Sequence, residues 1–188
     1  MGSNGSIHFF STDEALIEGL ITAYSAPSSM LNADASHNGR GTPMIIKSER
    51  FISVYDGSFA VYGDMYAEAA LLSSAVGKPA MCLTNGNDEV IGIFAQDGNK
   101  IVTEGLFIDG EWHYDLDAAL FLDKIALPYE KEEFAVLLET DDSSALVESF
   151  QAMTGLAFVW SEVDIYCLDK ERSAGNVDIY KQIRPFDF

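Results

Sequence analysis

Three glycine-containing turns divide the middle of the chain into four short apolar runs, and this feature restricts the possible folds more than any other. The runs are AMCLTN from Ala80, EVIGIFAQ from Glu89, KIVTEGLFI from Lys100 and EWHY from Glu111. The connections contain Gly86, Gly98 and Gly110, and Asp-Gly between strand-like runs is a strong signal of a tight hairpin turn. The stretch therefore predicts an antiparallel meander.

The segments before the meander alternate between strands and helices. IHFF, from Ile7, predicts a first strand, and MIIKSERFISVYDGSFAVYGD predicts two strands that flank Asp56-Gly57. A helix is expected over 11–25, where Ser11 and Glu14 match a capping box. A second helix is expected over 64–77, between an Asp64 cap and Gly77. The long polar segment 26–43, which holds His37 and Arg40, is typical of a functional or mobile loop.

The segments after the meander continue this mixture. DLDAALFLDKI predicts a short helix capped by Asp115 or Asp117, and DDSSALVESFQAMTG predicts a helix that ends at Gly155. FAVLLE is too short for periodicity to distinguish strand from helix. The last part of the chain predicts three strands, LAFVWS, VDIYCLD and VDIYKQI, and the repeated VDIY indicates two similar half-buried strands that could pair.

Strands in runs with helices between the groups predict a single α+β domain, with a largely antiparallel sheet of hairpin and meander packed by about four helices. The chain has 188 residues, enough to bury a core. We expect residues 1–6 to be a flexible leader or tag remnant and residues 7–188 to form the domain. Cys82 and Cys167 lie in apolar runs without metal-ligand spacing, which predicts buried free thiols.

The charge balance excludes several kinds of partner. The chain has 30 acidic residues against 11 lysines and arginines, a formal net charge of −19. Nucleic acids and anionic membrane surfaces bind through Lys and Arg patches, so neither is an expected partner. A field of this sign speeds encounter with basic proteins. The sequence has no apolar run of membrane-spanning length and no secretory signal, so we expect a cytoplasmic protein.

The stretch DGEWHYDLD, from Asp109 to Asp117, has two interpretations. As a strand it places Glu111, His113 and Asp115 on one face, a set that could ligate a metal or transfer protons. The simpler interpretation is a solvated strand that leads into a helix cap. Nothing in the sequence places His8 or His37 beside it, and the chain has no nucleophile elbow and no phosphate-binding loop. We therefore expect no catalytic residues, metal or cofactor.

Clustered acidic residues are the remaining signal. They form three groups: Asp109, Glu111, Asp115 and Asp117; Glu130, Glu132 and Glu133; and Glu139, Asp141 and Asp142. Between Phe51 and Asp123 the basic residues are Lys78 and Lys100 alone. Such groups usually form a solvated face, and the functional interpretation is a docking face for a basic protein. Trp112 or Tyr114 would anchor the partner if its side chain points outward.

Two parts of the chain carry a resemblance. Met65–Phe107 has a helix followed by strands joined through NGND and DGN, and the segment FAVLLETDDSSALVESFQAMTGLAF has an apolar element, an acidic turn and a helix. This layout, together with the acidity, resembles bacterial immunity proteins encoded beside polymorphic or contact-dependent toxins. The resemblance implies a catalytically inert protein that binds one toxin tightly, and it carries over no catalytic residues.

These observations predict a non-enzymatic binding protein that neutralises a basic, nuclease-like toxin domain by occluding its active site. The expected contact residues are Asp109, Glu111, Trp112, Tyr114, Asp115, Asp117, Asp141 and Asp142. One alternative is an enzyme or small-ligand binder with a cleft near His113 and the 26–43 loop. Another alternative is a structural homo-oligomeric subunit, and the sequence leaves the choice between monomer and homodimer open.

Overall fold

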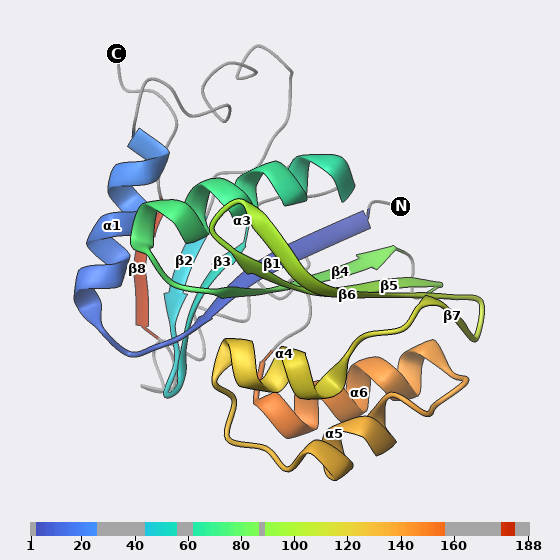
Figure 1. Cartoon of the computed structure of the whole chain (residues 1–188). Coiled ribbons are helices and arrows are strands. Elements are labelled where there is room, and N and C mark those ends of the chain that lie inside the picture. Colours follow the sequence, from blue (N-terminus) through green and yellow to red (C-terminus); the bar gives the residue numbers. More distant parts are fainter. Residues whose placement is uncertain (1–2, 26–43, 56–61, 87–88, 157–177, 183–188) are drawn as a thin grey trace.

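A computed structural model describes residues 3–25, 44–55, 62–86, 89–156 and 178–182 (Figure 1). Its strands are β1 (Ser3–Phe10), β2 (Met44–Lys47), β3 (Phe51–Tyr55), β4 (Ala80–Gly86), β5 (Val90–Asp97), β6 (Lys100–Ile108), β7 (Glu111–Tyr114) and β8 (Asp178–Gln182). Its helices are α1 (Glu14–Ser25), α3 (Tyr62–Val76), α4 (Ala118–Ile125), α5 (Lys131–Leu137) and α6 (Ser143–Thr154).

The described strands form one antiparallel sheet with the order β7-β6-β5-β4-β1-β3-β2-β8. Helices α1 and α3 cover one face, and α4, α5 and α6 cover the other (Figure 1). The fold is thus a single α+β domain with a largely antiparallel sheet, as the sequence predicts. Because both faces are covered, the central strands are apolar along their length instead of alternating. All of Ala80–Thr84 in β4 is buried, for example.

The predicted meander is confirmed as β4 to β7, and its turns use the expected residues. Asp109 and Gly110 join β6 to β7 with φ values of 51° and 88°. Two successive left-handed residues form a type I′ turn, which matches the twist of a hairpin. Gly98, between β5 and β6, also has a positive φ, of 54°. These turns place the β4–β5 and β6–β7 connections at the same end of the sheet.

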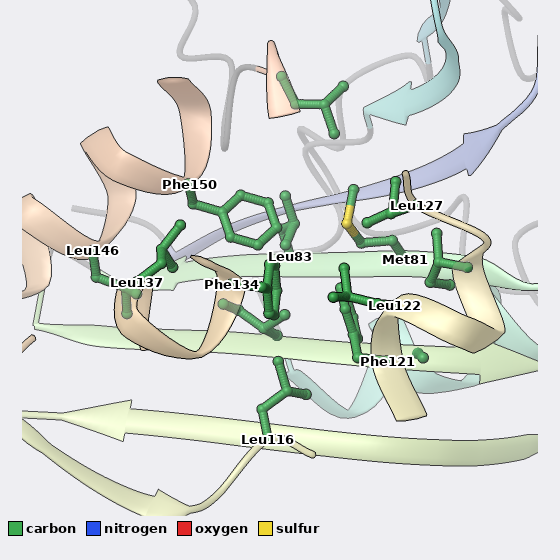
Figure 2. Close-up of a cluster of buried hydrophobic side chains, with 14 of the residues drawn as sticks. Met81, Leu83, Leu116, Phe121, Leu122, Leu127, Phe134, Leu137, Leu146 and Phe150 are labelled. Atoms are coloured by element: carbon green, nitrogen blue, oxygen red, sulfur yellow. The ribbon is translucent and has the colours of Figure 1, made fainter. Parts of the chain in front are cut away.

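A cluster of phenylalanines joins α4, α5 and α6 to the sheet (Figure 2). Phe121 stacks on Phe134 with ring centroids 5.5 Å apart, and Phe134 meets Phe150 edge to face at 6.1 Å. Each of these side chains is fully buried. They pack against Met81 and Leu83 of β4, which point to this face of the sheet. Alternate residues of the same strand, such as Cys82, belong to the core under α1 and α3.

The first half of the chain differs from the sequence predictions in two places. The flexible leader does not extend over Ser3–Ser6, because β1 begins at Ser3 and pairs with both β3 and β4. The hairpin between β2 and β3, which turns through Ser48–Phe51, was not predicted. Ser48 N–H donates to Phe51 O at 2.8 Å, and the Ser48 hydroxyl accepts from Phe51 N–H at 3.2 Å. These bonds close a tight turn that contains no glycine.

The helix ends follow local capping chemistry. Asp117 and Asp142 cap α4 and α6 by accepting from Leu120 N–H and Ala145 N–H, and Gly155 ends α6 with a φ of 72°. The first four residues of the undetermined run FAVLLE belong to α5, and Leu138 is its C-cap. The capping box at the start of α1 is replaced by Asp13, which accepts from Ala15 N–H at 3.0 Å. Helix α3 begins at Tyr62, two residues before the predicted cap.

Several predicted features lie outside the described residues. They are the 26–43 loop with His37 and Arg40, the turn residues Asp56 and Gly57, the LAFVWS strand after Leu156, and the first VDIY strand with Cys167. The second VDIY segment contains β8, which pairs with β2. Cys82 is buried with a free thiol, as predicted, and burial raises its pKa well above the usual value.

Candidate functional site

The structure brings two of the predicted acidic groups together at one end of the sheet. Asp109 N–H donates to Glu89 O at 3.1 Å, so the β6–β7 turn contacts the β4–β5 turn. Gly110 lies against the α5–α6 connection, because a Cβ atom on Gly110 would be only 2.8 Å from Asp141 O. Three turns thus meet here. Exposed acidic side chains at these contacts include those of Glu89, Asp109, Glu111, Asp141 and Asp142, and we call this set the acidic end.

The charge of the meander is polarised along its strands. Lys78 and Lys100, the basic residues of this part of the sequence, lie at the opposite end, where α3 leads into β4 and β5 turns into β6. Strand β6 alone separates the two ends by its nine residues, from Lys100 to Ile108. At about 3.3 Å per residue this is roughly 25 Å, several times the ~8 Å Debye length at physiological ionic strength. These two lysines therefore leave the field of the acidic end largely uncompensated.

Asp115 and Asp117 lie further along the same edge of the sheet. Both are exposed, and they follow β7 toward the start of α4. Asp117 N–H donates to the Thr103 hydroxyl at 3.0 Å, while the Asp117 carboxylate caps α4. Asp142, at the acidic end, likewise has an exposed side chain that also caps a helix, in this case α6. Two of the predicted contact residues are thus also helix caps, so their substitution affects stability as well as charge.

The structure distinguishes the two candidate aromatic anchors. Trp112 is half-buried, and its indole N–H donates to Leu138 O at 2.8 Å. Its ring meets Phe107 edge to face at 5.2 Å and lies over Gly105, where a Cβ atom would be 2.7 Å from Trp112 Cζ3. Tyr114, by contrast, is 59% exposed. Trp112 therefore fixes β7 to the helical layer, and Tyr114 is the aromatic side chain available to a partner.

His113 is exposed on β7 between these two residues. Among the described residues no group of three His, Cys, Asp or Glu side chains could hold a metal ion. A shallow hollow of about 490 Å³ lies elsewhere, between α4 and the start of α5, where Leu122, Asp123, Tyr129 and Lys131 line it. The other predicted acidic residues of this region, Glu130, Glu132, Glu133 and Glu139, are exposed at the two ends of α5.

Sequence reasoning missed a buried histidine, His8. His8 is fully buried in β1, and its ring nitrogens contact the Ser6 hydroxyl at 2.8 Å and the Ser53 hydroxyl at 2.7 Å. Burial lowers the His8 pKa to about 3, so the imidazole is neutral at physiological pH. Because Ser6 and Ser53 are also buried, we interpret this trio as a satisfied polar group of the core. The available signal in the sequence was the alternation of polar and apolar residues in the first strand, at Ser6, Ile7, His8 and Phe9.

Comparisons with known proteins add nothing to this geometry, because no family model, curated protein or solved structure matches the chain. None of the described helices is both long and apolar enough to cross a membrane. The functional argument therefore depends on the position of the exposed charges and of the residues that fix them in place.

Proposed function

We propose that the protein is a non-enzymatic binding protein whose acidic end docks onto a basic protein surface. In line with the resemblance to immunity proteins, the proposed partner is a basic, nuclease-like toxin domain, and binding would occlude the active site of that toxin. The proposed location is the cytoplasm. The observation that carries the proposal is the polarisation of the meander, which gathers exposed carboxylates from three turns at the end opposite to Lys78 and Lys100.

Two features of the acidic end support a docking role. Hydrogen bonds and close packing hold the turns in place, so a partner would meet a preformed array of charges instead of ordering flexible loops. Preorganisation of this kind lowers the entropic cost of association. A one-signed array also steers diffusional encounter, which raises the association rate at low ionic strength. Tyr114 adds an exposed aromatic contact further along β7.

The experiment begins with a tagged pull-down from the source organism, washed at low and then high salt, to recover the partner by mass spectrometry. Its association rate is then measured with a variant that combines Asp109→Asn, Glu111→Gln and Asp141→Asn. Asn is well suited to position 109, since it tolerates a left-handed φ. We expect the association rate at low salt to fall about tenfold or more, because electrostatic steering is lost.

A matched control removes three charges elsewhere, with Glu18→Gln, Glu132→Gln and Glu148→Gln. All three side chains are exposed and lie on α1, α5 and α6. If net charge alone governs binding, the two variants will slow association equally, and the docking site is not the acidic end. Recovery of a stoichiometric partner without basic character would contradict the proposal itself.

A further inference from the structure

The outer edge of β7 is the second unusual feature of this surface. β7 is the terminal strand in the sheet order and pairs with β6 alone within the described part of the chain. Three of its four side chains, those of Glu111, His113 and Tyr114, are exposed. An exposed terminal strand presents backbone donors and acceptors that another extended chain can use.

The turn geometry identifies which backbone groups face outward. In a hairpin closed by a two-residue type I′ turn, the residues that flank the turn, here Ile108 and Glu111, form a hydrogen-bonded pair. The next pair, Phe107 and Trp112, is then of the non-hydrogen-bonded kind. Its N–H and C=O groups point away from the partner strand. The backbone of Trp112 therefore offers one donor and one acceptor to the open edge.

The Trp112 side chain anchors this edge. β7 departs from regular pairing just beyond it, because Trp112 lies opposite Phe107 and Tyr114 opposite Leu106, which leaves His113 as an extra residue. Its indole N–H bonds to Leu138 O, and its ring packs between Phe107 and the surface of Gly105. An added strand would consequently meet a backbone that is already ordered, and little conformational entropy would be lost at this position.

The charges along the edge determine which strand it can accept. Asp109 and Glu111 lie at one end of β7, and Asp115 and Asp117 follow its other end. A second copy paired here through a two-fold axis would run antiparallel. Its Asp115 and Asp117 would then lie close to Asp109 and Glu111, and like charges opposite one another destabilise a pair of strands. An extended segment rich in lysine and arginine has the complementary charge.

We propose that the outer edge of β7 accepts an extended basic segment of the partner protein as an added strand. The backbone of Trp112 would pair with this segment, while the flanking carboxylates contact its cationic side chains and Tyr114 its apolar ones. This inference rests on the proposed function, because it assigns the basic partner a specific mode of binding at the same surface. The four-residue length of β7 limits the added ladder to a few hydrogen bonds.

The test uses two capped peptides of about eight residues in which lysine alternates with threonine or valine, a pattern that favours an extended strand. The second peptide carries N-methyl groups on its central residues, which removes backbone donors and keeps every charge. Binding is followed by NMR titration of the full chain, together with amide hydrogen exchange at Trp112. We expect the unmodified peptide to slow Trp112 exchange about tenfold or more, and the methylated peptide to bind about fivefold or more weakly without this protection.

Three results would overturn the inference. Equal binding of both peptides without protection of Trp112 would show that basic segments bind through the carboxylates alone, and the proposed function would stand. If neither peptide binds, strand addition is excluded as the binding mode. The toxin association experiment would still decide the function separately. A concentration-dependent mass that the unmodified peptide abolishes would place a second copy of the protein on the edge instead.

Discussion

The two faces of the sheet are covered in different ways. On one face, α1 and α3 pack small and aliphatic side chains such as Ala69, Leu20 and Leu72 against the sheet. On the other face, three consecutive short helices are attached through phenylalanines, of which Phe121, Phe134 and Phe150 are fully buried. Helices of 7 to 12 residues are marginal in isolation, so α4, α5 and α6 depend on this packing for their stability.

The helical layer beside the acidic end is also tied down by polar contacts. Arg50, in the β2–β3 turn, donates to the Tyr129 hydroxyl at 2.9 Å and lies over the Tyr129 ring at 5.3 Å from its centroid. The Tyr129 hydroxyl donates in turn to Met153 O at 2.6 Å. These contacts join the β2–β3 turn to the α4–α5 connection and to the end of α6, whereas the Trp112 bond to Leu138 holds the α5–α6 connection that bears Asp141. The face covered by α4, α5 and α6 therefore positions the proposed docking site, whereas the face covered by α1 and α3 stabilises the sheet.

The largest effect is expected from Phe134→Ala. This substitution leaves a cavity between Phe121 and Phe150, and such losses cost ~3–5 kcal/mol of unfolding free energy. We expect one cooperative transition in urea, shifted to lower concentration, because β4 contributes alternate residues to both cores. Val136→Ala on the same helix is the control, since Val136 is 65% exposed and its truncation should cost less than ~0.5 kcal/mol.

Amide hydrogen exchange of the Phe134→Ala variant tests the comparison itself. If the two faces form one cooperative unit, exchange protection falls in α1 and in α6 alike. Protection lost in α6 but retained in α1 would show that the aromatic layer unfolds separately. In that case the acidic end would belong to a locally unstable region, contrary to the preorganised array on which the proposed function depends.

Sequence patterns located the elements whose signals are local. The meander follows from its Asp-Gly and glycine turns, and the end of α6 follows from Gly155. The hairpin at Ser48 was missed because its two turn residues, Glu49 and Arg50, carry no turn signature. There, strand pairing and a serine hydroxyl determine the conformation, and neither is visible in the residues of the turn itself.

The candidate site depends on contacts between distant segments, which residue patterns do not encode. The sequence identified Asp109 and Asp141 as members of two acidic groups, but only the packing of Gly110 against Asp141 O brings these groups together. Similarly, the alternation of EWHY left open whether Trp112 or His113 faces the core. The bond from the indole to Leu138 O, 26 residues further along the chain, determines that orientation.

The pH dependence of the unfolding free energy should report on the buried His8 imidazole. His8 has a pKa of about 3 when folded and about 6.5 when unfolded, so the unfolded chain binds a proton that the folded protein excludes. This contribution to stability is complete above pH 6.5 and is lost as the pH falls from there toward 3, by ~1.4 kcal/mol per pH unit. Urea unfolding of wild type and His8→Gln across this range isolates the histidine.

The expected signature is a difference between the two pH profiles, because the many carboxylates titrate in both proteins. Below pH 6.5 the unfolding free energy of wild type should fall more steeply with decreasing pH than that of His8→Gln. The difference in slope should correspond to one additional proton bound on unfolding. Parallel profiles would mean that the folded protein protonates His8 as readily as the unfolded chain does. That outcome would contradict the neutral imidazole between Ser6 and Ser53.

The smallest effects are expected at the helix caps, which can be compared across the two faces. Asp142→Ala removes the cap of α6, and Asp13→Ala removes the equivalent bond at the start of α1. Each should lower the unfolding free energy by ~1 kcal/mol in urea titrations, since the exposed helical N–H loses its acceptor. Asp142→Asn keeps an acceptor oxygen, so it should retain most of the stability while removing the charge. If Asp142→Asn is as destabilised as Asp142→Ala, the carboxylate charge itself stabilises α6, and charge at the acidic end then serves the fold as well as the partner.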